Sequence, residues 1–133
     1  MSAARSLRDK WARGETAFGV WAALPDAFAA ELMCVDGVDY ICVDQQHGLV
    51  DYAEMVEMLR AIEGRRTAVP LTRVPVNQAW IIGKALDAGM QGVVVPMVNN
   101  RAEAAARRDG VPLLSGRRAV FRPGPGLHGH EQP

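Results

Sequence analysis

Asp44 and His47 lie three residues apart in the segment DQQHG, and their side chains are the ones in this chain best suited to acid–base chemistry. They follow an apolar run, residues 38–43, that predicts a buried strand. A carboxylate near an imidazole can form an oriented acid–base pair. A second apolar run ends in LTRVP and puts the guanidinium of Arg73 at an equivalent position. An acid, a base and an anion-binding group at the ends of successive strands are typical of an active site on a β/α scaffold.

The segments around these residues alternate between strands and helices. Apolar runs predict strands, and helical spacing with glycine stops predicts helices. The expected strands are 18–23, 38–43, 68–72 and 92–95, and the expected helices are 6–13, 27–35, 51–64, 77–88 and one from 100 onward. This alternation implies a parallel sheet with right-handed crossovers. Since a (β/α)8 barrel needs about 250 residues, we predict an α/β fold made of about the first four βα units of a TIM barrel.

The composition is that of one globular domain. The chain has 133 residues, 49% of them hydrophobic, with 15 basic and 15 acidic side chains, so we expect neither nucleic acid nor a membrane as a partner. No apolar run is long enough to cross a bilayer, and residues 1–10 lack the apolar core of a signal peptide. Cys34 and Cys42 lie in apolar segments, which predicts buried, reduced thiols in a cytoplasmic protein.

The end of the chain differs in character from the rest. After Arg107 glycine and proline are frequent and no apolar period continues, which predicts an irregular C-terminal tail over residues 108–133. His128, His130 and Glu131 carry groups that can bind metals, but a histidine pair in such a tail does not by itself predict a site.

Four blocks of this sequence resemble a known enzyme family. They are the strand end VDQQHG, the helix DYAEMVEMLRAIEG, the strand end LTRVP and the segment KALDAGMQGVVVPMVNNRAEA. In this order and spacing they resemble the class II pyruvate aldolases, the 4-hydroxy-2-oxo-heptanedioate aldolase family, with 2-dehydro-3-deoxyglucarate aldolase as a relative. The resemblance runs from about Phe18 to Ala106. Many members have Glu where this chain has Gln46, a departure that concerns substrate choice rather than fold.

The resemblance implies a reaction and roles for three residues. Members of the family are (β/α)8 barrels, usually homo-oligomeric hexamers, that cleave 4-hydroxy-2-oxo acids to pyruvate and an aldehyde with a divalent metal (Mg, Mn or Co). By position, His47 matches the catalytic base, Asp44 the carboxylate that orients it, and Arg73 the arginine that holds the pyruvyl group and its enolate. These roles suit the chemistry, because a base must take the proton of the 4-hydroxyl group and a cation must stabilise the charge that develops on the 2-oxygen.

Each of these residues also has a structural interpretation. His47 can cap the following helix or bond a backbone carbonyl, and Arg73 can form a structural bridge to Asp44. Their occurrence together in matching blocks favours site positions. A lysine Schiff base is the other chemical route to such a cleavage. The chain has only Lys10 and Lys84, and Lys84 falls inside a predicted outer helix rather than at a strand end.

The family's metal ligands are a Glu and an Asp on later strands, so the resemblance implies no metal ligands in this chain. Codons that encode the tail can also encode, one base over from about Arg107, the family-like sequence ACRYFPAGGRSFGPVR. We hypothesise that a frameshift separates residues 1–107, the N-terminal half of a TIM-barrel aldolase domain, from the tail 108–133. We therefore expect the chain to be truncated and inactive alone.

Two other functional hypotheses remain. The first is a non-catalytic half-barrel that persists only by self-association or with full-length subunits, because half a barrel leaves two parallel strand edges open. The second is a related acyl-CoA lyase, which we rank last because nothing in the sequence resembles a nucleotide-binding loop.

Overall fold

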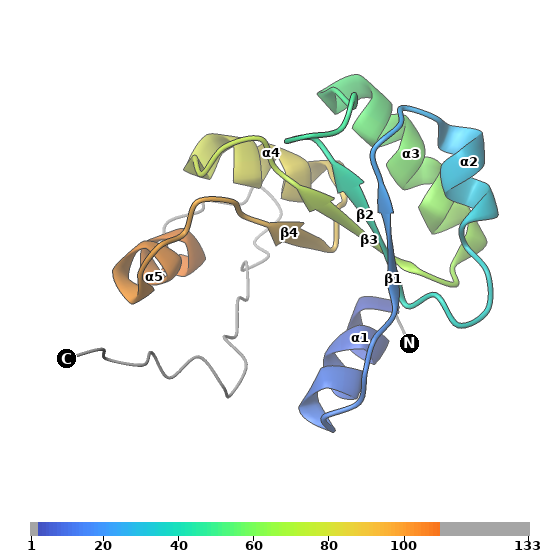
Figure 1. The fold of residues 1–133 in the computed structure, drawn as a ribbon, viewed down its shortest axis with the longest axis horizontal. Helices are drawn as coiled ribbons and strands as arrows, with labels where there is room; N and C mark the ends of the chain where they lie inside the picture. The colour runs from blue at the N-terminus through green and yellow to red at the C-terminus, as the bar shows by residue number, and fades with distance from the viewer. Residues whose placement is uncertain (1–2, 110–133) are drawn as a thin grey trace.

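The computed structural model describes residues 3–109, and helices alternate with strands throughout this range (Figure 1). The elements are α1 (Ala3–Ala12), β1 (Gly19–Ala22), α2 (Ala27–Leu32), β2 (Tyr40–Asp44), α3 (Tyr52–Arg65), β3 (Val69–Arg73), α4 (Ala79–Ala88), β4 (Gly92–Val94) and α5 (Arg101–Asp109). The predicted alternation is confirmed. The irregular tail was predicted to begin at residue 108, but residues 108 and 109 still belong to α5. The rest of the expected tail, from residue 110 on, lies outside the described residues. Among residues 3–109 no helix has the length and apolar character needed to cross a membrane.

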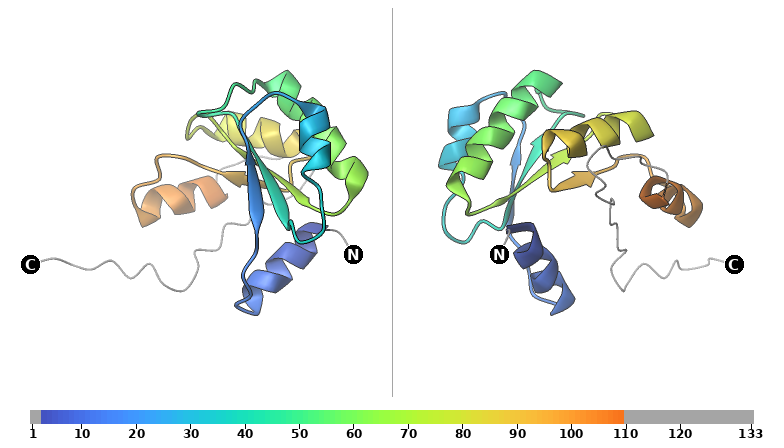
Figure 2. Two further views of the ribbon diagram at one scale, coloured as in Figure 1. Left: turned by 45° about the vertical axis from the view of Figure 1, so that its right-hand side comes forward. Right: turned by 180° about the vertical axis from the view of Figure 1, so that it is seen from behind.

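The strands form one parallel sheet in the order β1-β2-β3-β4. Helices α2, α3 and α4 each connect two consecutive strands, and the rear view in Figure 2 shows α3 and α4 in front of the sheet. Consecutive parallel strands joined by helices form the βα units from which a (β/α)8 barrel is built. Within the described range, β1 and β4 form the two edges of the sheet, as the sequence predicted.

The side chains of each strand point alternately to the two faces of the sheet. One face is covered by helices and the other is open. Ile41 and Val43 belong to a buried apolar cluster. Its members from α3 are Met55, Met58, Leu59 and Ile62. Since successive strand residues point to opposite faces, Cys42 and Asp44 lie on the side away from the helices. Residues in register on parallel neighbours share a face, so Arg73, the partner of Asp44, lies there too.

Helix α2 is shorter than the sequence predicted. Asp26 caps its first turn, with its side chain accepting the backbone N–H of Ala29 at 3.0 Å. The predicted helix continued to about Val35, whereas α2 ends at Leu32. A tight turn follows, in which the N–H of Cys34 is donated to the carbonyl of Glu31 at 3.1 Å. The turn ends the helix early because it lets the Cys34 side chain, only 2% exposed, pack into the apolar cluster.

The bounds of the other elements differ from the prediction by a few residues, and the differences at the ends of α3, β2 and β3 bear on the site. Helix α3 continues past Gly64, because Arg66 rather than the glycine takes the left-handed C-cap position, with φ of 58°. Strands β2 and β3 extend one residue further than expected, to Asp44 and Arg73. These two residues are therefore the last residues of their strands and are held by the sheet.

Helix α1 lies near the amino ends of the strands, away from their arrowheads (Figure 1). Lys10 on α1 donates a 2.7 Å hydrogen bond to the carboxylate of Asp39, the residue before β2, and the same carboxylate accepts the N–H of Phe18. The hydrogen bond from Lys10 is the main cause that lowers the pKa of Asp39. This ion pair ties α1 to the amino ends of the strands.

Candidate active site

Asp44 and Arg73 form an ion pair at the carboxyl ends of β2 and β3. The two residues are register partners. Nε of Arg73 donates to Oδ1 of Asp44 at 2.9 Å, and Nη2 of Arg73 donates to Oδ2 of the same carboxylate. Two parallel N–H···O bonds of this kind fix the plane of the guanidinium as well as its position. The structural bridge considered from the sequence is therefore present, and it lies where a strand-end site was predicted.

The carboxylate of Asp44 is buried and accepts further hydrogen bonds. Oδ1 accepts the backbone N–H groups of Gln46 at 3.0 Å and of His47 at 3.2 Å, and Oδ2 accepts the indole N–H of Trp21 at 3.0 Å. The hydrogen bond from Arg73 is the largest cause that holds the pKa of Asp44 well below its usual range, although burial acts in the opposite direction. The carboxylate is thus anionic at neutral pH and has its acceptor sites occupied.

Trp21 is a residue of this site that the sequence analysis missed. Its ring lies beside the Arg73 guanidinium, with 5.2 Å between the ring centroid and Cζ. Trp21 is in register with Cys42 and so shares the open face of the sheet with Asp44. The sequence does place Trp21 in the first predicted strand. Its side chain points to the same face of the sheet as Asp44 and Arg73, at the ends of the next two strands. This shared face can be recognised only when the register between the strands is known.

His47 lies in the loop after β2, and this loop is fixed to both neighbouring strands. The N–H of Gln45 is donated to the carbonyl of Arg73 at 3.0 Å, and the N–H of Leu49 to the carbonyl of Ala23 at 2.8 Å. The His47 side chain is exposed. Within the described part of the chain, Asp44 bonds the backbone N–H of His47 and no hydrogen bond reaches the imidazole. Asp44 therefore orients the loop that carries His47, rather than contacting its imidazole as expected.

Thr72 supports the same loop from the helix-facing side of β3. It is fully buried, and its hydroxyl lies 2.9 Å from the carbonyl oxygen of Val43 and 3.2 Å from the side-chain oxygen of Gln45. These contacts join the end of β3 to the end of β2, one residue before the ion pair. The backbone beneath the site is thus held by hydrogen bonds on both faces of the sheet.

The described residues do not provide a metal site. Among residues 3–109, no three His, Cys, Asp or Glu side chains lie together in a way that would hold an ion. The buried carboxylate nearest the site, Asp44, already accepts hydrogen bonds from Arg73, Trp21 and two backbone groups. The cation implied by the resemblance does not fit these residues, and its ligands would have to lie elsewhere.

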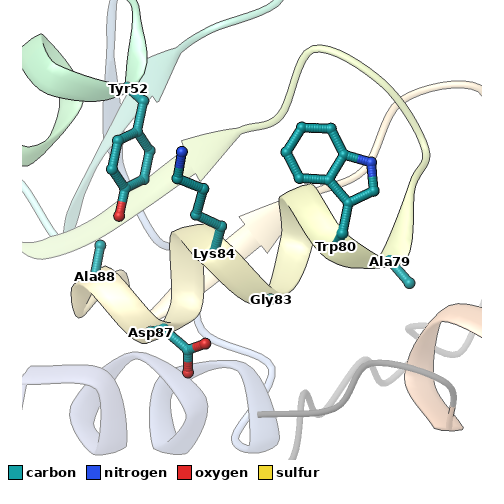
Figure 3. A pocket seen from close by; sticks show the side chains of 7 residues that line it. All are labelled: Tyr52, Ala79, Trp80, Gly83, Lys84, Asp87 and Ala88. Carbon is teal, nitrogen blue, oxygen red and sulfur yellow. The ribbon is translucent and has the colours of Figure 1, made fainter. Parts of the chain in front are cut away.

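A surface hollow of about 350 Å³ lies on α4 and is separate from the predicted site (Figure 3). Its lining residues are Tyr52, Ala79, Trp80, Gly83, Lys84, Asp87 and Ala88. Nζ of Lys84 lies 4.0 Å from the centroid of the Tyr52 ring. Lys84 lies on α4, in a helix as the sequence predicted, and its ammonium group lies against an aromatic ring rather than at a strand end.

Four consecutive parallel βα units with polar strand ends define an α/β protein with part of a (β/α)8 barrel. Residues 17–110 match the family described as HpcH/HpaI aldolase/citrate lyase, and the chain belongs to this family. The resemblance identified from the sequence is confirmed over almost the same range.

Three known proteins illustrate the similarity. The chain is 40% identical over 98 residues to a hydroxypyruvate/pyruvate aldolase of Rhizorhabdus wittichii, covering 74% of this chain and 39% of the relative. It is 36% identical over 101 residues to a 4-hydroxy-2-oxovalerate aldolase of Rhodococcus jostii, covering 76% and 39%. The crystal structure of an HpcH/HpaI aldolase/citrate lyase family protein from Burkholderia cenocepacia superposes with a TM-score of 0.71 at 28% identity, covering 87% of this chain and 48% of that one. The chain thus spans about two fifths of the length of these two curated relatives.

Proposed function

We propose that this chain carries the base and the anion-binding arginine of a class II pyruvate aldolase, a lyase that cleaves 4-hydroxy-2-oxo acids to pyruvate and an aldehyde. The observation that carries the proposal is the Asp44–Arg73 ion pair at the strand ends, next to the fixed loop of His47. Family membership supports it. The relatives named for hydroxypyruvate/pyruvate and 4-hydroxy-2-oxovalerate support a small 2-oxo acid as the substrate.

In the proposed reaction, the imidazole of His47 takes the proton of the substrate's 4-hydroxyl group, directly or through one water. The bond between C3 and C4 breaks, the aldehyde leaves, and the electron pair of that bond forms the enolate of pyruvate. The enolate then takes up a proton at C3, and His47 gives up the proton it accepted. These reaction steps need a cation next to the 2-oxygen, where the negative charge of the enolate develops.

Arg73 would supply that cation. Its Nε and Nη2 are engaged by Asp44, while no hydrogen bond among the described residues uses Nη1. Nη1 is then the group available to donate to the substrate's 2-oxygen. Asp44 would act by holding Arg73 and the His47 loop in place. The described residues offer no ligand set for a divalent metal, so the steps assigned to them involve His47, Arg73 and Asp44 alone.

A coupled assay tests this function. Pyruvate release from a 4-hydroxy-2-oxo acid would be followed through NADH and lactate dehydrogenase, with Mg²⁺, Mn²⁺ or Co²⁺ added. We expect His47→Ala to reduce turnover by about 100-fold or more and Arg73→Lys by about tenfold or more, because lysine cannot keep the bidentate contact. Arg60→Lys, at an exposed position of α3, is the control. Measurable turnover of the original chain that His47→Ala leaves unchanged would contradict the proposal. The same assay decides whether the chain is inactive alone.

A non-catalytic half-barrel that associates with a second copy is the second candidate. Its support is an apolar stripe made of Phe28 and Leu32, which lie four residues apart on α2, and of Leu24 in the segment before that helix; the three side chains are 61–67% exposed. Burial of these three side chains from each copy would remove several hundred Å² of apolar surface, which is in the range of a weak interface, and pairing of the open edges of β1 and β4 would add backbone hydrogen bonds to it. We further propose that the whole enzyme is a cytoplasmic homo-oligomer.

Sedimentation of the chain distinguishes the candidates. We expect a discrete oligomer that dissociates in Phe28→Glu, because a buried unpaired charge opposes association. Trp80→Glu is the matched control, since Trp80 is 63% exposed but lies on α4 outside the stripe. A stable monomer without turnover would argue against both candidates.

A further inference from the structure

The indole of Trp21 contacts both members of the strand-end ion pair. Its N–H is donated to Oδ2 of Asp44 at 3.0 Å, the same oxygen that accepts Nη2 of Arg73. Its ring lies 5.2 Å from Cζ of Arg73. We propose that Trp21 is a positioning residue that holds the Arg73 guanidinium in the orientation in which Nη1 meets the substrate. This inference rests on the function proposed above for Arg73.

The two contacts of Trp21 restrict different motions. The bidentate bond to Asp44 fixes the guanidinium only as firmly as the carboxylate itself is fixed. The indole N–H holds the second carboxylate oxygen, while Gln46 and His47 hold the first through their backbone N–H groups. The ring beside the guanidinium opposes a tilt out of its plane, and the contact is favourable because the ring quadrupole attracts the cation. Trp21, Asp44 and Arg73 thus form one unit built from β1, β2 and β3.

A purely structural role for Trp21 fits the packing less well. Its side chain is on the open face of the sheet, it is 47% exposed, and it does not belong to the buried apolar cluster. Its two specific contacts in this structure are both with the ion pair. A side chain that served packing alone would bury more of its surface against apolar neighbours.

Two substitutions separate the contacts. Trp21→Phe keeps a ring beside Arg73 and removes the N–H donor, whereas Trp21→Leu removes both. Trp80→Phe is the matched control, because its indole N–H bonds Gln78 at 2.6 Å, away from the ion pair. Hydrogen exchange of the Arg73 Nε–H, measured by NMR, reports directly on how firmly the guanidinium is held. We expect exchange to be about fivefold faster in Trp21→Phe, faster still in Trp21→Leu, and unchanged in Trp80→Phe.

Binding of pyruvate, the probe ligand, gives the second measurement. We expect Trp21→Phe to weaken pyruvate binding by about fivefold in the original chain and to have no effect in an Arg73→Lys background, because Trp21 acts through Arg73. A loss of affinity that persists in that background would overturn the assignment. Unchanged Nε–H exchange in a Trp21→Phe variant with native circular dichroism would do so as well.

The two proposals fail in different ways. If the original chain neither binds pyruvate nor turns over substrate, the proposed function fails, and the exchange of the Arg73 Nε–H still decides whether Trp21 positions the guanidinium.

Discussion

Asp44 and Arg73 are paired in register as the last residues of two adjacent parallel strands, and the arginine donates two hydrogen bonds to the carboxylate. Register on a parallel sheet places both side chains on the same face, and the strand ends place both at the same rim. The ion pair therefore follows directly from the strand pairing. It connects the anion-binding arginine of the proposed site to the backbone of the loop that carries His47.

Asp44→Asn tests the importance of this pair. The amide keeps one acceptor oxygen but presents an NH2 group to one donor of Arg73, so the bidentate contact is lost. We expect the free energy of unfolding to fall by about 1–3 kcal/mol and pyruvate binding to weaken by about tenfold. Urea unfolding and calorimetric titration measure the two effects. Asp36→Asn, at an exposed loop position, is the control and should change neither. An Asp44→Asn variant with the original stability would show that the pair contributes little.

We expect Asp44 to contribute to the decrease in the free energy of unfolding at acid pH. Its pKa is lower in the folded chain than in the unfolded chain, chiefly because of Arg73. The contribution of Asp44 is therefore present above the unfolded value of about pH 4 and is lost as the pH falls toward the folded value. The unfolded chain takes up the proton first, so acid favours unfolding.

We expect the urea midpoint to fall more steeply below about pH 4 in the original chain than in Asp44→Asn. The carboxylate of Asp39, whose pKa is also lowered, is present in both proteins and cancels in the comparison. Between about pH 7 and pH 5 the difference between the two proteins should stay constant. Parallel curves over the whole acid range would contradict the role assigned to Asp44.

The positions of Asp44 and Arg73 at one rim could be predicted from the sequence, because the carboxyl ends of successive parallel strands meet at the same edge of a sheet. The sequence left open whether Asp44 and Arg73 form a direct ion pair or act separately in the site. The answer depends on the strand register, because a shift of one residue would turn one of the two side chains to the other face of the sheet. The contact of Asp44 with the backbone of His47, rather than its imidazole, depends on loop dihedrals that residue types do not determine.

The polar contact of Trp21 could not be predicted from the sequence. A tryptophan in a short apolar run predicts packing, and nothing in its neighbours indicates a polar partner. Its hydrogen bond to Asp44 spans 23 positions in the chain. The early end of α2 has a similar cause, because the burial of Cys34 against distant core residues overrides the local helical pattern. Both features are set by tertiary contacts.

The two cysteines should resist thiol reagents in the folded chain. Burial raises the pKa of Cys42 to about 12 and also raises that of Cys34, and both side chains are buried and free. Because the thiolate is the reactive form, we expect labelling by Ellman's reagent to require unfolding. Thr16→Cys supplies an exposed thiol as the control and should label at once. Complete labelling of the original chain under native conditions, at the rate of that control, would contradict the observed burial.

Gly48 should be essential for the loop that carries His47. A Cβ atom at this position would collide with the carbonyl oxygen of Asp44 and lie 2.9 Å from that of Ala23, and both obstacles are backbone atoms. Gly48→Ala must therefore move the loop, and we expect a loss of about 1–3 kcal/mol in the free energy of unfolding, as for other overpacked sites. The displacement should also lower pyruvate-forming turnover, because His47 adjoins the substituted residue.

Gly64→Ala is the matched control for this substitution. A Cβ at Gly64 meets nothing within 4 Å, and the residue lies in the last turn of α3. Alanine restricts the unfolded chain more than glycine does and suits a helix, so we expect the free energy of unfolding to rise by about 0.5–1 kcal/mol with turnover unchanged. The two variants add the same methyl group and should move stability in opposite directions. Equal stability of the two would mean that the loop after β2 is not held by the contacts with Ala23 and Arg73 described above.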